Sequence, residues 1–311
     1  MANSTLATLV QQSMQELGVS GSGLPSTVIG NTAYDVVQTL ALTNGYGRNL
    51  LREHQWQQVT TEYRFTTVFY TYTATTTSGS TGLSVLSSTT GLTTTPTYFM
   101  VTGTGIPQDT YLVSVNAGAS TAVMSQAATA TGTLVSLTFS QTMYAFPSDY
   151  DRLVPRTEWD KSKRWELAGP NTAQQWQWLK SGYISTGPLI RFRPLAGLFQ
   201  IWPPLGSADL LGFEYVSKNW VLATAGTAPT KTGFTVDTDT CIFPDQLMNA
   251  LIKRAYVRAK GFDSTAVDAE YNMQLDLAKA HDASMPNLSL APKPVDLLIS
   301  ATNIPDSGYG P

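Results

Sequence analysis

The chain has 311 residues, 42% of them apolar and 13% charged, and a formal net charge of −3. This length allows two domains, or one domain with an insertion, and the apolar content suffices for a core. The negative balance argues against a protein that wraps nucleic acid by neutralising its phosphates. The single cysteine, Cys241, excludes an internal disulfide and a cysteine-based zinc site.

The sequence gives no signal for membrane or cofactor chemistry. No basic segment followed by an apolar one opens the chain, and no run of about 18 apolar residues occurs. The two histidines, His54 and His281, lie far apart in the sequence. We therefore expect a soluble protein made in the cytoplasm, with no membrane insertion, no metal and no cofactor.

Two amphipathic helices are predicted near the start of the chain. The first ends at Gly18 and carries its buried residues at helical spacing: Leu6, Leu9, Val10, Ser13, Met14 and Leu17. The second is expected to have Thr32 as its cap and this buried side: Val36, Val37, Leu40, Ala41, Leu50 and Leu51. Gly45 and Gly47 weaken its middle, so a bend or a close neighbour is expected there. His54 is interpreted as an ordinary helix-end histidine rather than a general base.

The next stretch changes composition abruptly. Residues 65–148 contain a single charged side chain, Asp109, and are rich in Thr, Ser and Gly. Apolar and hydroxyl residues alternate at period two between Gly-rich turns, as in half-buried strands. We predict an inserted all-β domain over residues 68–141, whose exposed faces carry hydroxyl groups and whose two ends lie close together.

After the insert, a short helix is predicted over residues 172–179, followed by extended segments over 189–194, 198–202 and 210–220 that form an antiparallel meander. The clearest helix begins near Pro244 and ends at Gly261. Another starts at Asp263 or Ser264 and completes a helical hairpin. Prolines after residue 284 predict an extended tail.

Together these elements predict an α+β fold with a helical core made by the N-terminal helices and the C-terminal hairpin. The core comprises residues 1–67 and 142–283 and includes the antiparallel β meander. The insert occupies residues 68–141, and the extended C-terminal arm occupies 284–311.

Several carboxylates of the chain allow both a catalytic and a structural interpretation. Carboxylates follow the insert among cations: Asp149, Asp151, Glu158 and Asp160, with Arg152, Arg156, Lys161, Lys163 and Arg164. A glycosidase needs two carboxyl groups flanking one sugar bond, but mixed charge in a turn is more often a salt-bridged surface. Asp237 and Asp239 resemble the start of a calcium loop that lacks its Gly and Glu, so turn and capping roles are favoured. No nucleophile–base–orienter set is visible, so no catalytic residue is predicted.

Two groups of side chains are candidates for partner contacts. Lys253 and Lys260 share one helix face, and Arg254 and Arg258 share another. These cations would meet phosphates or acidic partner surfaces, although a solvated face is the more common arrangement. Trp176 and Trp178 cannot both point inward from one helix, so one of them is a candidate interface anchor unless a nearby loop covers it.

The order of short motifs outside the insert resembles that of the head-to-tail adaptor (connector) proteins of tailed bacteriophages. The motifs are residues 41–44, 52–56, 65–67, 144–153, 175–179, 201–204, 213–220, 237–240, 243–245 and 258–261. In simpler relatives, the strand after Trp56 leads almost directly into the turn at residues 144–153. The β insert has no counterpart in this pattern, so the resemblance implies no role for it.

The resemblance implies a homo-oligomeric ring of about twelve copies that joins the portal to the tail and extends the DNA channel for genome retention and ejection. Expected partners are the portal protein and a tail tube or nozzle protein, with tail fibres as a further candidate. DNA would pass without specific binding, and the protein would reside at the head–tail junction of the virion after assembly in the host cytoplasm. In relatives, the C-terminal segment enters clefts between portal subunits.

The resemblance therefore assigns portal contacts to Val295, Leu297, Leu298 and Ile299. Inter-subunit or tail-facing contacts are expected from Trp176, Trp178, Lys253, Arg254 and Arg258. Two other classes of function remain open. One is a virion-associated cell-wall glycosidase using Asp149, Asp151 and Glu158, and the other is a tail fibre or receptor-binding protein whose β insert is the binding head.

Overall fold

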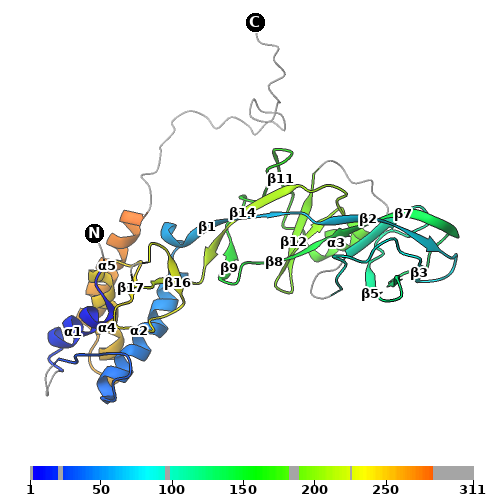
Figure 1. Ribbon diagram of the computed structural model, residues 1–311. Helices are drawn as coiled ribbons and strands as arrows, with labels where there is room; N and C mark the ends of the chain where they lie inside the picture. The colour runs from blue at the N-terminus through cyan, green and yellow to red at the C-terminus, as the bar shows by residue number, and fades with distance from the viewer. Residues whose placement is uncertain (1–2, 20–23, 95–98, 182–188, 225, 283–311) are drawn as a thin grey trace, which may run out of the picture. The chain divides into compact units, whose positions relative to one another are not determined.

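The protein is described here from a computed structural model, which describes residues 3–19, 24–94, 99–181, 189–224 and 226–282 (Figure 1). Within these residues it has a mixed α+β fold with five α-helices and several antiparallel sheets, as predicted. No helix in these ranges has the length and apolarity needed to cross a membrane.

The described residues form two compact units. The helical unit comprises residues up to 61, 149–153 and 215–282, and the strand unit comprises residues 62–148 and 154–214. The predicted core of residues 1–67 and 142–283 thus contributes to both units. The independent folding of residues 68–141 and the arm at 284–311 stay predictions, and the arm lies outside the described residues.

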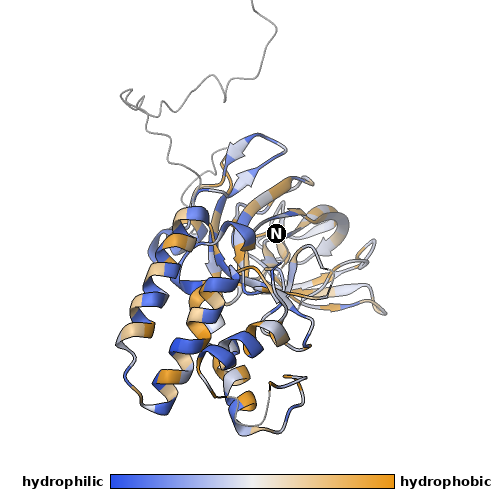
Figure 2. Ribbon diagram, turned by 90° about the vertical axis from the view of Figure 1, so that its left-hand side faces the viewer, coloured by the Kyte–Doolittle hydropathy of each residue, from blue (hydrophilic) through white to orange (hydrophobic). Residues whose placement is uncertain are grey.

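The helical unit is built from four amphipathic helices, which carry hydrophobic and hydrophilic stretches in alternation (Figure 2). They are α1 (Leu6–Glu16), α2 (Tyr34–Glu53), α4 (Asp245–Lys260) and α5 (Thr265–Asp282). Helix α4 contacts the other three, and it ends at Gly261 in the left-handed conformation with φ +75°. The helical hairpin and the predicted helix ends at Gly18, Pro244 and Gly261 are confirmed, because caps and period-3.6 patterns are local signals.

The buried side of α2 differs from the prediction. Ala33, not Thr32, is the N-cap residue, and its N–H donates to Asn31 Oδ1 over 2.8 Å. The face that packs inward holds Val36, Thr39, Thr43, Gly47 and Leu50, whereas Val37 is 47% exposed. A Cβ atom added to Gly47 would lie 2.4 Å from the Trp220 ring, so the close neighbour expected at this glycine is confirmed. Trp220 thus packs against the buried side of α2 at Gly47, and α4 and α1 also contact this helix.

Short strands complete the helical unit. A three-stranded sheet has the order β16-β15-β17, with β15 (Val221–Leu222) between β16 (Pro229–Lys231) and β17 (Thr240–Cys241). A 3₁₀ helix, η1 (Gln57–Val59), follows α2. Strand β9 (Tyr150–Leu153) pairs with the end of β14 (Leu210–Ser217), where Tyr215 lies opposite Leu153.

The largest sheet of the strand unit has six strands in the order β4-β7-β2-β3-β6-β5. Its strands are β2 (Phe69–Thr76), β3 (Gly82–Ser84), β4 (Phe99–Gly103), β5 (Leu112–Asn116), β6 (Thr121–Met124) and β7 (Gly132–Gln141). The outer strands β4 and β5 meet, because Met100 bridges Tyr111 and the Val101 N–H donates to Thr110 O over 2.8 Å. The sheet therefore curls back on itself.

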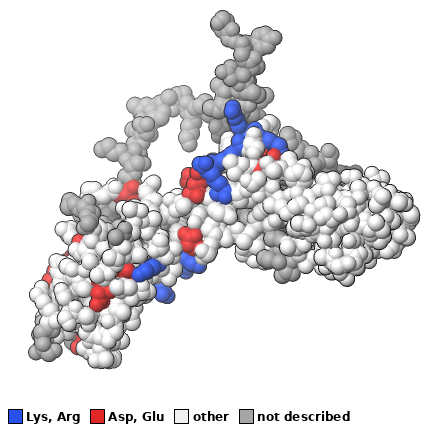
Figure 3. Space-filling view, viewed as in Figure 1, with Lys and Arg blue, Asp and Glu red and all other residues white. Residues whose placement is uncertain are grey.

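This curled sheet has its own hydrophobic core. The buried residues alternate along the strands and include Phe99, Leu112, Leu137 and Phe139. The outward positions are mostly hydroxyl residues, and the face seen in Figure 3 carries no charged side chain over β2 to β7. The predicted all-β character of this segment is confirmed.

Helix α3 and two further sheets complete the strand unit. Helix α3 (Ala173–Lys180) begins with a capping box formed by Thr172 and Gln175. One sheet has the strand order β12-β13-β8. It consists of β8 (Met143–Ala145), β12 (Arg191–Leu195) and β13 (Leu198–Trp202). The other sheet has the strand order β1-β14-β10-β11. It consists of β1 (Thr60–Thr66), β10 (Trp159–Asp160), β11 (Trp165–Glu166) and β14.

The predicted three-stranded meander is correct for two of its three strands. Strands β12 and β13 pair as expected, but β14 lies in the other sheet and β8 takes the third place. The register explains the difference, because β13 already pairs on one side with β12 and on the other with Met143 to Ala145. Consecutive extended segments do not by themselves fix which strand fills a sheet edge.

Candidate interaction surfaces

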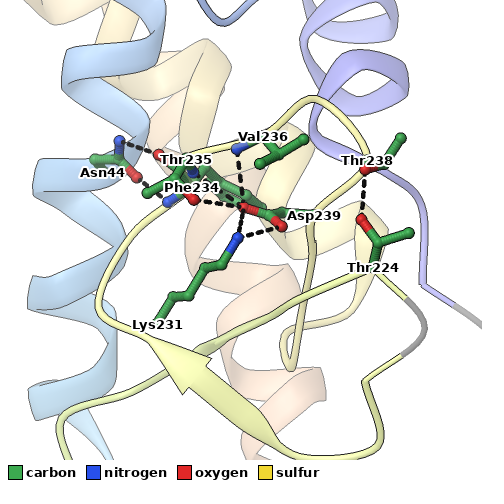
Figure 4. A network of polar contacts seen from close by, with 8 residues as sticks. All are labelled: Asn44, Thr224, Lys231, Phe234, Thr235, Val236, Thr238 and Asp239. Atoms are coloured by element: carbon green, nitrogen blue, oxygen red, sulfur yellow. Dashed lines mark hydrogen bonds and ion pairs between the residues drawn. The ribbon is translucent and has the colours of Figure 1, made fainter.

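The sequence motif at residues 237–240 forms a polar clasp around the buried carboxylate of Asp239 in the helical unit (Figure 4). Asp239 has no exposed surface, and its carboxylate accepts from Lys231 Nζ over 2.7 and 2.9 Å. The same carboxylate accepts from the N–H groups of Thr235 and Val236 over 3.0 Å each. Burial raises the pKa of Asp239, but the Lys231 ammonium and these N–H groups outweigh it and leave the pKa below its usual value.

The other residues of the motif tie distant segments to this clasp. Asp237 Oδ1 accepts from the N–H groups of Val28 and Ile29 over 3.1 and 2.7 Å. The carbonyl groups of Asp239 and Asp237 accept from the first residues of α1. Asn44 of α2 accepts from the Phe234 N–H over 2.8 Å. The predicted turn role of these carboxylates is confirmed, whereas the groups that accept from the start of α1 are backbone carbonyls.

No group of three or more His, Cys, Asp or Glu residues within the described ranges is placed to hold a metal ion. His54, interpreted as a helix-end histidine, is the C-cap residue of α2. Its Nε2 lies 3.3 Å from Asp282 Oδ2, at the last residue of α5. The same carboxylate accepts from the Gln57 N–H. His54 thus joins two helix ends.

The three carboxylates considered for a glycosidase occupy different surroundings. Asp149 accepts from Tyr215 Oη over 2.9 Å and from Ser217 Oγ over 2.7 Å, and Asp151 Oδ1 lies 2.9 Å from Arg52. Both belong to the helical unit, whereas Glu158 belongs to the strand unit. Glu158 is buried, and this burial raises its pKa although backbone hydrogen bonds oppose the shift. The interactions of Asp149 and Asp151 are those of structural carboxylates.

Cations on α4 form ion pairs with acidic residues of neighbouring helices. Lys253 Nζ lies 2.8 Å from Glu16 and 2.7 Å from Glu270. The Asp268 carboxylate forms ion pairs with both Arg254 and Arg258, over 2.7 and 2.9 Å. The hydrogen bond from Arg258 is the main cause that lowers the pKa of Asp268 to about 2. The cations expected at inter-subunit or tail-facing contacts thus stabilise the helix bundle, and their role toward partners stays a prediction.

The two candidate tryptophans of α3 lie in different environments. Trp176 is 3% exposed and packs with Met100, Leu179 and Trp202, whereas Trp178 is 50% exposed. The two side chains therefore do not both point inward, as predicted, and Trp178 is the one exposed to a partner.

Sequence reasoning missed an exposed apolar set in the helical unit. Phe262 is 67% exposed after Gly261, and Tyr34 is 74% exposed at the start of α2. On α5, Met273 and Leu277 are 61% and 48% exposed and lie four residues apart, on one helix face. The signal was present in the sequence, because these two residues fall outside the buried stripe of Tyr271, Leu275 and Ala278. The residues predicted to contact a portal, Val295, Leu297, Leu298 and Ile299, lie outside the described residues.

Comparison with known protein families gives one result. Residues 101–290 match the family model described as SU10 adaptor protein. This range covers more than half of the chain and includes β5 to β17 as well as helices α3, α4 and α5. A comparison with curated protein sequences finds no match.

Proposed function

Because the chain belongs to the SU10 adaptor protein family, a family of phage head–tail adaptors, we propose that it forms a ring between the portal and the tail of a phage. Twelve copies would surround a channel through which the genome is retained and then ejected. The observation that carries this proposal is the family match over residues 101–290. The protein would reside in the virion, at the head–tail junction.

The surface of the helical unit suits a protein that contacts other copies of itself. A closed ring requires each subunit to offer two different faces, because its interfaces are heterologous. Phe262 and Tyr34 are exposed, and so are Met273 and Leu277, which lie four residues apart on α5. Exposed aromatic and Met side chains are typical anchors of protein interfaces.

The charge distribution suits a channel that DNA passes without binding. The cations of α4 are neutralised by Glu16, Glu270, Asp268 and Asp35 within the helical unit. The net charge of the chain is −3. Phosphate binding depends on cations that are available to replace counterions, so this arrangement favours passage over adhesion.

The C-terminal arm is the proposed portal anchor. Residues 295–299 read Val-Asp-Leu-Leu-Ile, which is an apolar sequence within a proline-rich segment. An extended segment of this kind gains order when it fills a groove or joins a sheet edge of its partner. The tail tube or nozzle protein, and tail fibres as a further candidate, would then bind elsewhere on the ring, where the exposed Trp178 is a candidate anchor.

Truncation after Ser284 tests the portal anchor. The shortened protein should fold, keep its helices and form rings, yet fail to co-sediment with DNA-filled heads. The double variant Leu297→Asp, Leu298→Asp should fail in the same way, because two charges would enter an apolar groove. A matched control, Ser300→Asp with Thr302→Asp, adds the same charge to the same arm and should retain attachment. Undiminished attachment of the truncated protein would exclude the arm as the anchor.

The two other classes of function have their own tests. A cell-wall glycosidase would clear a suspension of purified cell wall, and the clearing would disappear in Asp151→Asn. A fibre or receptor-binding protein would be a trimer rather than a large ring. The structural roles of Asp149 and Asp151 favour the adaptor over the glycosidase.

A further inference from the structure

Helix α5 carries an apolar stripe on its solvent side, the α5 stripe. It consists of exposed residues spaced by 3, 4, 4 and 3 positions: Ala266, Ala269, Met273, Leu277 and Ala280. At about 100° of rotation per residue, these side chains fall within about 80° of the helix circumference. The buried stripe of Tyr271, Leu275 and Ala278 lies on the opposite side of the helix. Because α5 is apolar on two opposite sides, it has a second surface suited to packing.

Helix α2 carries a similar stripe on its own solvent side, the α2 stripe. It consists of exposed residues with the same spacing of 3, 4, 4 and 3 positions: Tyr34, Val37, Ala41, Gly45 and Arg48. Val36, Thr39 and Thr43 are buried on the other side of the helix. The α2 stripe includes Val37 and Ala41, the two apolar residues that were expected to be buried and are exposed instead.

The two stripes are complementary in size when the helices are aligned in parallel. Each pair of facing residues then joins a larger side chain to a small one: Tyr34 with Ala266, Val37 with Ala269, Ala41 with Met273, Gly45 with Leu277, and Arg48 with Ala280. Facing positions that combine large and small side chains allow two helices to interdigitate. The antiparallel alignment opposes Val37 to Leu277, which are both large, and leaves small residues opposite each other elsewhere. The parallel alignment therefore fits better.

The parallel alignment agrees with the course of the two helices in one subunit. Lys260 Nζ, at the end of α4, lies 2.9 Å from Asp35 Oδ1 at the start of α2, and α5 begins shortly after Lys260. At the opposite ends, His54 Nε2 after α2 lies 3.3 Å from Asp282 Oδ2 at the end of α5. Helices α2 and α5 thus run in broadly the same direction. A ring axis along these helices keeps that direction from one copy to the next.

The charges beside the two stripes are also complementary. Asp276, at the edge of the α5 stripe, has no ion pair within the described residues. Arg48 donates to Thr232 O over 3.3 Å and has no carboxylate partner in the part of the chain that the structure describes. In the parallel alignment, Asp276 lies one helical turn from the position opposite Arg48. An exposed ion pair contributes little free energy, so this pair favours the alignment rather than supplying the affinity.

We propose that the α5 stripe of one copy packs in parallel against the α2 stripe of the next copy, and that this contact repeats around the ring. The partner is a second copy of this chain, because the chain itself supplies a stripe of equal spacing, complementary size and opposite charge. The contact joins two different surfaces, as a closed ring requires. This inference rests on the proposed adaptor function and names the surfaces that would hold neighbouring subunits together.

Cysteine cross-linking of the full-length protein tests the pairing and its alignment. The single native cysteine, Cys241, is 1% exposed, so two introduced cysteines would be the accessible thiols. Oxidation of the variant Ala41→Cys, Met273→Cys should give a ladder of covalent dimers, trimers and larger species on a non-reducing gel, because facing residues of packed helices come within disulfide reach. The matched control Ala41→Cys, Asn272→Cys places the second thiol on the neighbouring exposed residue outside the stripe and should stay monomeric on the gel.

Substitutions in the stripes test the contact without a cross-link. Leu277→Asp should convert rings into monomers and leave the helical circular dichroism unchanged, because the side chain is exposed within one subunit. Asn272→Asp adds the same charge to the same helix outside the stripe and should retain the ring. Ala41→Met alone should weaken assembly because two large residues would meet. Its combination with Met273→Ala exchanges large and small and should restore assembly.

Native mass spectrometry of the same samples separates the contact from the ring. Rings that give no ladder with Ala41→Cys, Met273→Cys, or rings that persist in Leu277→Asp, would refute the contact and leave the ring standing. A ladder that stops at the dimer would overturn the repeating contact. A protein that stays monomeric and gives no ladder would refute the ring and the contact together.

Discussion

The helical unit and the six-stranded sheet are stabilised by different means. In the helical unit, charged side chains carry specific contacts, such as Asp239 with Lys231 and Asp268 with Arg254 and Arg258. The six-stranded sheet has one charged residue, Asp109, and depends on backbone pairing and an apolar core. Loss of a charged side chain, or a change of pH, should therefore alter the stability of the helical unit much more than that of the six-stranded sheet.

The largest expected effect comes from a charge placed in the core of the helical unit. Leu251 of α4 is 2% exposed, so Leu251→Asp should cost about 4 kcal/mol or more and abolish a cooperative helical transition. Thr71→Asp, on the exposed face of β2, is the matched control and should change stability by less than about 0.5 kcal/mol. Thermal unfolding followed by circular dichroism measures both. A Leu251→Asp protein as stable as the unchanged one would contradict a core role for this face.

The next effect concerns the clasp of Figure 4. Asp239→Ala would leave Lys231 without its partner and two N–H groups without an acceptor, at a cost of about 3 kcal/mol. Asp276→Ala removes an exposed carboxylate from α5 and should be nearly neutral. Urea unfolding compares the two variants. Equal midpoints for Asp239→Ala and Asp276→Ala would show that the clasp contributes nothing.

Acidification should destabilise the helical unit more than the six-stranded sheet, with a smaller effect than that of the two substitutions above. The pKa of Asp268 is lowered to about 2 in the folded protein, mainly by the hydrogen bond from Arg258, and that of Asp239 is also lowered. Stability from a lowered pKa is complete above the ordinary Asp value of about 4 and is lost as the pH falls through the folded value. Hydrogen exchange at pH 4 and pH 2.5, corrected for the intrinsic rate, should show protection falling in α4 and α5 more than in β2 and β7.

A control for acid is available at neutral pH. Asp268→Asn removes the same charge and should lower the protection of α4 and α5 at pH 7, while β2 and β7 stay unchanged. Equal loss of protection in both regions on acidification would contradict the assignment of pH sensitivity to the ion pairs of the helical unit.

Removal of the six-stranded sheet should have the smallest effect on the helical unit. The ends of residues 68–141 lie side by side, because the Gln141 N–H donates to Val68 O over 2.9 Å, so a short Gly/Ser linker can replace the segment. The helical circular dichroism and the ring should be retained. Loss of soluble protein would instead show that the insert belongs to the core.

The same deletion has a local consequence in the strand unit. Met100 is lost from its contact with Trp176, Leu179 and Trp202, so tryptophan fluorescence should shift to longer wavelength. Met100→Ala in the full chain should reproduce part of this shift without removing the sheet. An unchanged fluorescence spectrum in both proteins would show that β4 does not contribute to the environment of these tryptophans.

Local signals made most of the helices predictable from the sequence. Gly18, Pro244 and Gly261 mark ends that the structure confirms, because caps depend on a few neighbouring residues. The buried face of α2 was not predictable, because it depends on partners that are distant in sequence, such as Trp220 at Gly47 and helix α4. The place of β14 in its sheet depends in the same way on pairing with distant strands.

The candidate interaction surfaces were predictable only in part. The turn roles of Asp237 and Asp239 and the division between Trp176 and Trp178 followed from spacing. The packing of Trp176 against Met100 and Trp202 did not, since these residues come from α3, β4 and β13. The exposed pair on α5 was visible as an apolar spacing outside the buried stripe.

The most direct test of the adaptor account is the mass of the assembled protein. Native mass spectrometry of the purified full-length chain, with class-averaged electron microscopy of the same sample, reads out copy number and symmetry together. Twelve copies of the 33.6-kDa chain predict a closed ring of about 400 kDa with a central opening. A trimer, or a monomer that stays monomeric in the presence of DNA-filled heads, would contradict the account.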